Sequence, residues 1–521
     1  MDARAQQVDE LFTRWAKSDS PGCAVAVWQG DQVVYRQGYG MANLEYHIPI
    51  TPATIFHVAS VSKQFAAAAI LLLQRDGLLS VSDDVRKTIP ELHDFGTPIT
   101  IDHLIHHISG LRDQWELLIA AGWRMEDVIT TDDILSLIFA QRELNFAPGA
   151  EYRYCNTGYT LMGLIVERVS GKTLRQFCAE RIFAPLGMTS THFHDDYQEI
   201  VPNRAYSYSE KDGGGFKHSH LLYGTVGATS LFTTVADLLR WEANFFNPRV
   251  GDAAFIEQMT RRPLLNDGQP IPYAAGLVVR DYRGVRSVEH SGGDAGYRTF
   301  LIHYPDHKLA ITVLSNLASV KPGVLAQKIA DIYLADHLSA PVPTIMLAEA
   351  ELPARAGWYH SAAVHETLHL TVESGVLQVD GWLKLTQLDA QHFISADSAH
   401  TQVNFSADGT SLTFEDGIGR GVPYERVEPL TLTLDRLSEY IGVYHCPELD
   451  ADYEIVLDSD TLALKRRKYG AVKLIGILPD SFVEAKTDFD LRFSRDATNA
   501  VSGFQRSNGR VRNLNFVRKA G

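Results

Sequence analysis

The chain has 521 residues and a formal net charge of −15 at pH 7, with 45% hydrophobic and 21% charged residues. This length exceeds what one compact core can fill, so about three domains are expected. The acidic balance argues against nucleic acid as a partner, because phosphate binding needs a positive surface. The hydrophobic content is ordinary for a globular protein and excludes a disordered or fibrous chain.

The cysteines and the terminal residues bound the type of protein further. Cys23, Cys155, Cys178 and Cys446 are widely separated, so neither a disulfide framework nor a zinc site is indicated, and we predict no metal and no cofactor. The N-terminus leads into an amphipathic pattern, and the apolar run at residues 65–73 is too short to span a bilayer. We therefore expect a cytoplasmic protein without a membrane partner, although removal of a signal peptide would leave the same sequence.

Strand-like runs near both ends of the first 338 residues predict a single antiparallel sheet. Residues 23–28 and 32–36 flank a short turn, as in a hairpin. The stretch from about residue 64 to 250 is mostly helix and loop. We therefore predict an α+β domain over residues 1–338, with the sheet covered by helices. Its later strands are expected at residues 276–279, 287–290, 299–302 and 309–314.

The rest of the chain is rich in strands and repeats itself. The prolines within residues 339–349 predict a linker. Beyond it, residues 357–360 match 442–445 at an offset of 85. The repetition predicts two similar antiparallel β-barrels or sandwiches, which we assign as barrels at residues 350–430 and 431–521. Further matches pair residues 373–379 with 458–464 and, at an offset of 88, residues 403–406 with 491–494.

Ser60 and Lys63 directly precede the apolar run at residues 65–73. Three residues apart on the first turn of a buried helix, the two side chains would share a face, so the amine could reach the hydroxyl. The unpaired N–H groups of the helix start favour negative charge on a nucleophile or an oxyanion. Because roughly two Ser-x-x-Lys matches arise by chance in a chain of this length, the pair indicates an activated nucleophile only together with partners.

Further polar motifs follow in order along the chain. Tyr154 and Asn156 lie in a loop after a Pro-Gly turn, and His290 ends a strand ahead of Gly292 and Gly293. The ordered set Ser-x-x-Lys, Tyr-x-Asn and His-x-Gly resembles the serine β-lactamase and penicillin-recognising hydrolase superfamily, most closely its D-aminopeptidase branch. The resemblance implies a β-lactamase-like catalytic domain followed by two β-barrels. It extends through residues 109–113, 181–185 and 448–452.

The residue types and the resemblance agree on chemical roles. Ser60 would be acylated, and Lys63 would ease its deprotonation, helped by a shift of the buried amine towards neutrality. Tyr154 would relay a proton between nucleophile, leaving group and water, and the sequence leaves open whether Lys63 or Tyr154 is the base. Asn156 would hold Lys63 or donate to the substrate carbonyl. The backbone N–H groups of Ser60 and Gly293 would form the oxyanion hole.

The third motif bears on the substrate. Superfamily members that process β-lactams or D-alanyl-D-alanine ends usually carry a carboxylate-binding Lys where this chain has His290. A mostly neutral His implies weaker selection for a terminal carboxylate. Gly292 and Gly293, lacking side chains, would let the substrate backbone lie against the strand. Structural roles stay open for Tyr154 as a core aromatic, Asn156 as a helix cap and His290 as a strand residue.

One departure from the D-aminopeptidase pattern concerns the last domain. In that pattern a long loop reaches the active site and helps to select a free amino terminus. Residues 485–490 form only a short hairpin here, which we expect not to cross a domain interface. Selection of an amine is therefore in doubt, and a wider pocket could admit esters or other acyl substrates.

These features together predict a serine hydrolase that forms an acyl-enzyme on Ser60 and cleaves short D-amino-acid amides, peptides or esters. One alternative is an esterase or β-lactamase of the same fold. Another is a non-catalytic penicillin-binding or scaffold protein. The expected partner is a small-molecule or short-peptide substrate, and assembly as a homodimer is left open.

Overall fold

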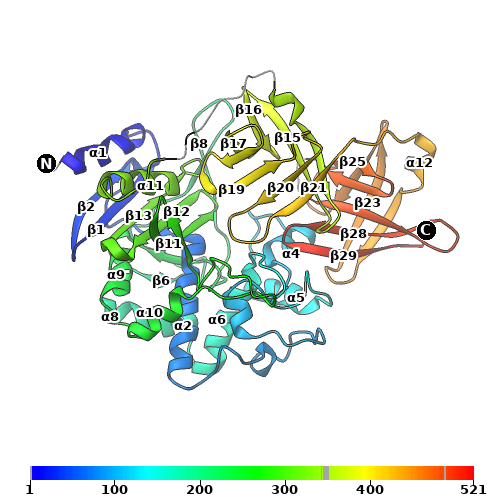
Figure 1. Cartoon of the computed structure of the whole chain (residues 1–521). Helices are drawn as coiled ribbons and strands as arrows, with labels where there is room; N and C mark the ends of the chain where they lie inside the picture. The colour runs from blue at the N-terminus through cyan, green and yellow to red at the C-terminus, as the bar shows by residue number, and fades with distance from the viewer. Residues whose placement is uncertain (1–2, 342, 344–350, 486–488, 521) are drawn as a thin grey trace.

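The computed structural model describes residues 3–341, 343, 351–485 and 489–520. An α+β domain is followed by two closed antiparallel barrels (Figure 1). This confirms the predicted fold class. Most of the predicted linker at residues 339–349 lies outside the described residues.

The N-terminal domain is built on a six-stranded antiparallel sheet. The N-terminal hairpin joins the later strands through pairing of β1 with β13, where Cys23 lies opposite Ser315. Strands from two distant parts of the sequence thus form one sheet, as the strand pattern predicts. In spatial order the strands are β10 (Val278–Tyr282), β11 (Val285–Asp294), β12 (Tyr297–Tyr304), β13 (Leu309–Ser315), β1 (Cys23–Gln29) and β2 (Gln32–Tyr39).

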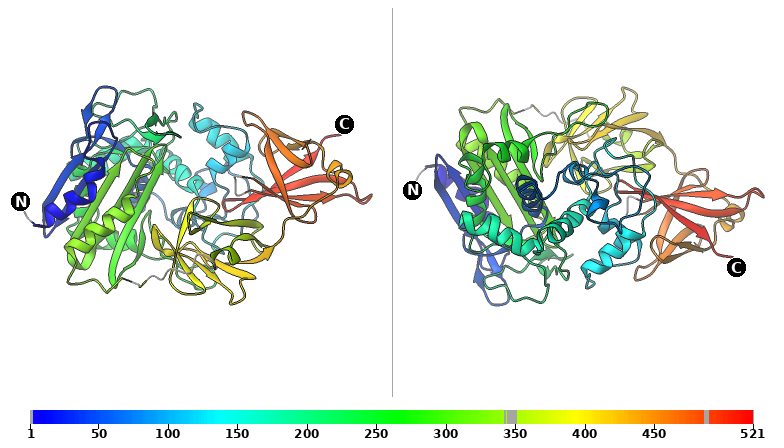
Figure 2. Two further views of the ribbon diagram at one scale, coloured as in Figure 1. Left: turned by 90° about the horizontal axis from the view of Figure 1, so that it is seen from above. Right: turned by 90° about the horizontal axis from the view of Figure 1, so that it is seen from below.

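Both faces of this sheet are buried. Val25 and Val27 of β1 point into one core, whereas Ala24 and Ala26 point into the other. Successive side chains of a strand point to opposite faces, so a strand apolar at every position must be covered on both sides. The first face is covered by α1 (Ala3–Phe12) and α11 (Pro322–Tyr333), and the second by a layer that includes α2 (Lys63–Arg75) and α9 (Val235–Phe246) (Figure 2).

Among the remaining helices of this domain, α6 (Asn156–Ser170) begins at Asn156, one of the candidate site residues. It is the longest of them, packs against α2 and ends before Gly171, whose φ of 71° suits glycine. The other helices are α3 (Ile101–Ile105), α4 (Gln114–Ala120), α5 (Thr131–Ala140), α7 (Leu174–Cys178), α8 (Ala184–Leu186) and α10 (Ala253–Thr260). Short strands are β3 (Met41–Asn43), β4 (Ile48–Pro49), β5 (Phe56–His57), β6 (His192–Phe193), β7 (Tyr208–Glu210), β8 (Phe216–His218) and β9 (Leu231–Thr233).

Each barrel closes eight consecutive strands. The repeated segments lie at equivalent places in the two barrels. They fall in the first strand, at the turn between the second and third strands, and in the sixth strand. This confirms the prediction of two similar barrels. The first barrel comprises β14 (Gly357–Ser361), β15 (Glu366–Glu373), β16 (Val376–Val379), β17 (Leu383–Gln387), β18 (His392–Ser395), β19 (Ser398–Phe405), β20 (Ser411–Glu415) and β21 (Val422–Val427). After α12 (Leu434–Ser438), the second comprises β22 (Gly442–Cys446), β23 (Ala451–Asp458), β24 (Thr461–Arg466), β25 (Val472–Leu478), β26 (Ser481–Glu484), β27 (Asp490–Arg495), β28 (Val501–Asn508) and β29 (Val511–Arg518).

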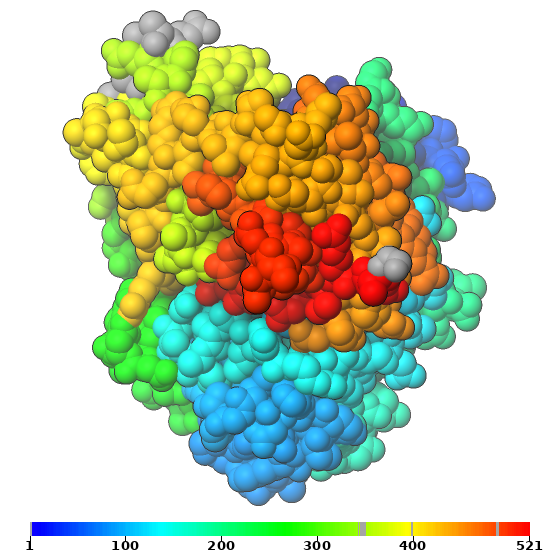
Figure 3. Space-filling model, turned by 90° about the vertical axis from the view of Figure 1, so that its right-hand side faces the viewer, coloured from blue at the N-terminus to red at the C-terminus, as the bar shows by residue number. Residues whose placement is uncertain are grey.

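The second barrel packs directly on α4 of the N-terminal domain. Leu117 and Ala120 belong to the apolar core of this barrel, and the Tyr453 hydroxyl donates to the Ala120 carbonyl over 2.7 Å. On this side of the molecule, residues of the second barrel border the segment around α4 and α5 (Figure 3). None of the helices in the described part of the chain is long and apolar enough to cross a lipid bilayer.

Candidate active site

Ser60 lies in a tight turn that leads into α2. The turn, η2 (Ala59–Ser62), is a 3₁₀ helix, so Lys63 is the first residue of α2. Ala59 has a φ of +49°, a left-handed conformation uncommon for alanine. Strand β11 packs against this turn, and a Cβ on Gly292 would lie 2.3 Å from the Val58 carbonyl oxygen. Gly292, expected to face the substrate, therefore lies behind the turn and permits this close approach, whereas Gly293 lines the pocket.

The amine of Lys63 is fully buried and makes three polar contacts. It lies 3.1 Å from Ser60 Oγ, 2.8 Å from Asn156 Oδ1 and 2.8 Å from the Ala228 carbonyl oxygen. Burial lowers the pKa of Lys63 to about 7, because charge is disfavoured away from water, while Asp113 raises it and Arg510 lowers it further. The amine can therefore exist in either protonation state near neutral pH.

The carboxylate of Asp113 orients Asn156. Asp113 Oδ2 accepts from the Asn156 backbone N–H over 2.6 Å and from Nδ2 over 2.8 Å. The amide oxygen of Asn156 therefore faces Lys63. Asp113 is completely buried at the N-cap of α4, where it also accepts from the Trp115 backbone N–H. The sequence alone did not indicate this positioning role, although Asp113 lies in the segment 109–113 that resembles the superfamily.

This orientation of Asn156 determines whether an N–H group or the lone pair of Lys63 faces Ser60 Oγ. The oxygens of Asn156 and Ala228 can only accept, so they take two N–H groups of Lys63. A neutral amine has only two N–H groups, and its lone pair then points to Ser60 Oγ. The geometry thus suits Lys63 to receive the serine proton.

Tyr154 lines the same pocket as Ser60. Its ring centroid is 4.8 Å from Lys63 Nζ and 5.2 Å from Cζ of Arg510. Burial raises the pKa of Tyr154 well above its usual value, although Ser60 and Arg510 both lower it. The phenol is therefore a proton donor at neutral pH.

His290 is buried in β11 and carries no charge at neutral pH. Burial and, to a smaller extent, Lys63 lower the pKa of His290 to about 3. Its Nδ1 lies 2.6 Å from the Ser291 carbonyl oxygen, which can only accept, so Nδ1 carries the proton. Nε2 then accepts from the Tyr273 hydroxyl over 2.9 Å. The third motif places a neutral imidazole in the pocket wall.

All three domains contribute to this pocket of about 550 Å³. Asp416 and Ile418 come from the loop between β20 and β21, and Arg510 comes from the turn between β28 and β29. Residues 486–488 of the hairpin at 485–490 lie outside the described residues. The second barrel nevertheless reaches the pocket through a different turn, which no sequence pattern indicated. Its Asn508-Gly509 pair is a hairpin signal, but nothing in the sequence links it to Ser60.

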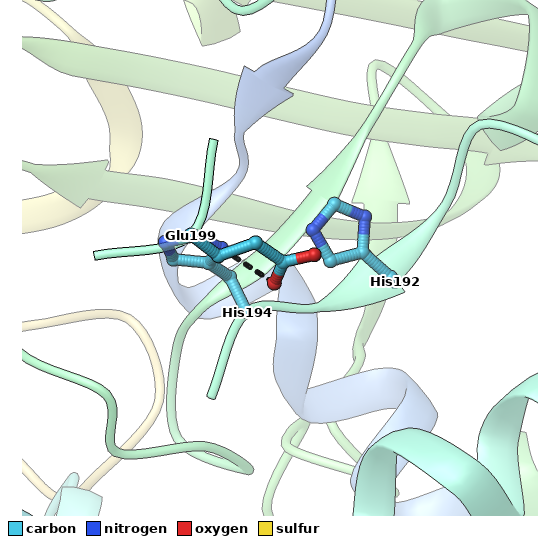
Figure 4. Close-up of side chains that lie close together, drawn as sticks. All are labelled: His192, His194 and Glu199. Carbon is cyan, nitrogen blue, oxygen red and sulfur yellow. Dashed lines mark ion pairs between the residues drawn. The ribbon is translucent and has the colours of Figure 1, made fainter. Parts of the chain in front are cut away.

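One group of possible metal ligands lies apart from the pocket. His192, His194 and Glu199 place their ligand atoms within 4.8 Å of one another (Figure 4). Both Glu199 oxygens accept from the Arg175 guanidinium, at 2.6 and 2.8 Å. Its positive charge opposes a cation at this point, so the group is explained by the ion pair and gives no reason to revise the prediction of no metal.

Comparison with known proteins identifies the family. The sequence matches the model of the Beta-lactamase family over residues 8–334. The chain belongs to this family. A D-aminopeptidase from Gluconobacter oxydans is 30% identical over 448 residues, covering 84% of this chain and 81% of the relative. A D-aminopeptidase from Brucella anthropi is 29% identical over 450 residues with the same coverage.

Solved structures show the same fold. The octameric penicillin-binding protein homologue from Pyrococcus abyssi covers 91% of this chain and 100% of its own, with a TM-score of 0.59 and 22% identity. A D-amino acid amidase from Ochrobactrum anthropi covers 64% of this chain and 98% of its own, with a TM-score of 0.54 and 23% identity. The protein is thus a serine β-lactamase-fold hydrolase related to D-aminopeptidases.

Proposed function

We propose that the protein forms an acyl-enzyme on Ser60 and hydrolyses short D-amino-acid amides or peptides. The observation that carries the chemistry is the buried chain Asp113–Asn156–Lys63–Ser60, which directs an amine of lowered pKa at the serine hydroxyl. The similarity of the protein to D-aminopeptidases along 84% of its chain supports the substrate class.

In the acylation step Ser60 Oγ attacks the substrate carbonyl carbon while its proton passes to Lys63 Nζ. The C–N bond of the tetrahedral intermediate then breaks. The departing amine takes a proton from Tyr154, and Lys63 returns its own proton to the phenolate. Lys63 is the base in this scheme because its pKa is lowered to about 7, whereas that of Tyr154 is raised.

Water completes the cycle. It attacks the acyl carbon and gives one proton to Lys63, and the ester bond to Ser60 Oγ then breaks as Lys63 passes that proton to the serine oxygen. The carboxylic acid leaves and the starting state is restored. The developing oxyanion would be bound by the backbone N–H groups of Ser60 and Gly293, which belong to the turn and to the strand that packs against it.

The test is a substrate panel measured together with intact mass. We expect hydrolysis of D-alanine amide and D-alanine anilide, with little turnover of L-alanine amide as the stereochemical control. Ser60→Ala should lower kcat by at least about 10³-fold. A nitrophenyl ester and a cephalosporin complete the panel.

Each outcome assigns the protein to a class. Faster turnover of the ester or the cephalosporin than of every D-alanine substrate would replace the proposal by an esterase or a β-lactamase. Equal rates for the wild type and Ser60→Ala would contradict the acyl-enzyme. An acylating probe that leaves no adduct on Ser60 would favour the scaffold alternative, and a persistent adduct would favour a penicillin-binding receptor.

A further inference from the structure

The turn that carries Arg510 is fixed to the N-terminal domain. The Arg510 carbonyl accepts from the Asp113 backbone N–H over 3.2 Å and from Asn145 Nδ2 over 2.9 Å. Asn145 Oδ1 accepts from the Arg512 backbone N–H over 2.7 Å. Asn508 Oδ1 closes the turn by accepting from the Arg510 N–H over 3.0 Å. The backbone of Arg510 is thus positioned by the same residue, Asp113, that orients Asn156.

The side chain of Arg510 projects into the pocket without an ionic partner. It is exposed and lines the cavity that contains Ser60. Its contact there is the Tyr154 ring, 5.2 Å from Cζ. Among the described residues no carboxylate forms an ion pair with this guanidinium, although the charges of Asp113 and Glu116 act on it from a longer distance. A planar guanidinium with unused donors is suited to a carboxylate from outside the chain.

The other cationic groups of the pocket are occupied or neutral. Arg280 pairs with Glu289 over 3.3 Å. His290 is neutral, and Lys63 loses its charge above pH 7. Among the described residues that line the pocket, Arg510 is therefore the cation that stays charged at neutral pH and forms no ion pair.

We propose that Arg510 binds the free C-terminal carboxylate of the leaving residue, so that short peptides with a free C-terminus bind better than their amides. The assignment to the leaving side rests on the proposed function, in which Tyr154 protonates the departing amine. A carboxylate bound beside the Tyr154 ring would then belong to the residue whose amine leaves. In this proposal Arg510 supplies the carboxylate binding that the sequence leads us to expect to be weak at His290.

The experiment measures binding without turnover. Ser60→Ala enzyme is titrated by calorimetry at pH 8, where Lys63 is mostly neutral, with D-alanyl-glycine and with D-alanyl-glycine amide. We expect the acid to bind about 10- to 100-fold more tightly than the amide. Adding Arg510→Gln should remove this difference, and Arg510→Lys should keep part of it. Arg467→Gln, the same change at an exposed position of the same barrel, should leave the difference intact.

Two further ligand pairs keep the proposal separate from the proposed function. Acetylglycine and its amide carry the same carboxylate contrast without a D-amino acid. If D-alanyl ligands fail to bind but Arg510 still favours acetylglycine over its amide, the D-amino-acid assignment fails and carboxylate binding stands.

D-glutamate amide and D-glutamine amide test a carboxylate on the acyl side. A preference for D-glutamate amide that depends on Arg510, with none for D-alanyl-glycine, would overturn the assignment to the leaving residue. Equal affinity for acid and amide in every pair, or an equal loss of both on Arg510→Gln, would overturn carboxylate binding altogether.

Discussion

The two barrels share one topology but attach to the N-terminal domain in different ways. The second barrel binds the completely buried side chain of Arg112. This guanidinium donates to the carbonyls of Arg512 and Asn513 and forms an ion pair with Glu448 at 2.9 Å. The ion pairs of the first barrel with the N-terminal domain are either exposed, as for Lys321 and Asp397 at 2.8 Å, or long, as for the partly buried Arg153 and Glu366 at 3.9 Å. The two barrels thus share one strand order but form different interfaces with the N-terminal domain.

This difference matters for the active site. The buried interface continues from Arg112 to Asp113, and Asp113 bonds both to Asn156 and to the backbone of Arg510. Hydrogen bonds therefore connect the second barrel, through Asp113 and Asn156, to the amine of Lys63. The first barrel contributes Asp416 to the pocket wall, held by Ile418 and Gly419 of its own loop.

The largest expected effect is on stability, from breaking the buried interface. Arg112→Met keeps apolar volume but leaves Glu448, which is 11% exposed, without its ion-pair partner, although the Arg142 backbone N–H still donates to it over 2.7 Å. We expect the free energy of unfolding to fall by about 3–5 kcal/mol, as for a buried ion pair with one partner removed. Urea unfolding followed by tryptophan fluorescence measures the change.

The matched control lies in the first barrel. Arg420, an exposed residue of that barrel, donates to Gln269 over 2.6 Å and pairs with Asp267. Arg420→Met should change the free energy of unfolding by less than about 1 kcal/mol, because exposed pairs contribute little. Equal losses for the two variants would contradict the distinction between the interfaces.

A smaller effect concerns the pH dependence of catalysis. The proposed base, Lys63, has a pKa lowered to about 7 by burial and by Arg510, so kcat/KM should rise as pH passes through that region and the amine deprotonates. Arg510→Gln removes a positive charge and should raise the pKa of Lys63. The acid limb then moves to higher pH, and activity on a neutral amide at pH 6.5 falls by about threefold.

Asp416→Asn of the first barrel is the comparison for this pH profile. The charge of Asp416 acts on Tyr152, whose pKa it raises together with the larger effect of burial. Lys63 is perturbed by Asp113, Arg510 and Asp294. The acid limb should therefore stay in place for Asp416→Asn, and a shift as large as that of Arg510→Gln would show that both barrels tune the base.

Local pattern predicted much of this structure, and long-range docking explains what it missed. Ser60 and Lys63 are three residues apart, so their spacing in the sequence predicts their contact. The pattern of apolar residues predicts the strands in the same way. The contact of Arg112 with Arg512 spans 400 residues. No periodicity relates two such positions, because their meeting depends on how a finished barrel packs on α4. For the same reason the sequence could not place Arg510 beside Tyr154.

The smallest predicted difference, one close to zero, tests whether the barrels are alike inside. Tyr359 of β14 and Tyr444 of β22 occupy equivalent positions, each buried. The Tyr359 hydroxyl donates to the Arg355 carbonyl at 3.1 Å, and that of Tyr444 to the Tyr440 carbonyl at 2.7 Å. In both cases the acceptor lies four residues earlier. An arginine of the last strand stacks on each ring, with Cζ of Arg426 at 5.8 Å and of Arg518 at 5.9 Å.

Replacement by phenylalanine removes the hydroxyl alone in each barrel. Tyr359 can also reach the Gly409 carbonyl at 3.2 Å, but one hydroxyl proton serves one acceptor at a time. Tyr359→Phe and Tyr444→Phe should each lower the free energy of unfolding by about 1 kcal/mol, the usual net contribution of one hydrogen bond. Urea titration of the two variants in parallel gives the comparison. A difference much above that value would mean that the interiors, like the interfaces, have diverged, whereas equal losses place the divergence at the interface that carries Arg112 and Arg510.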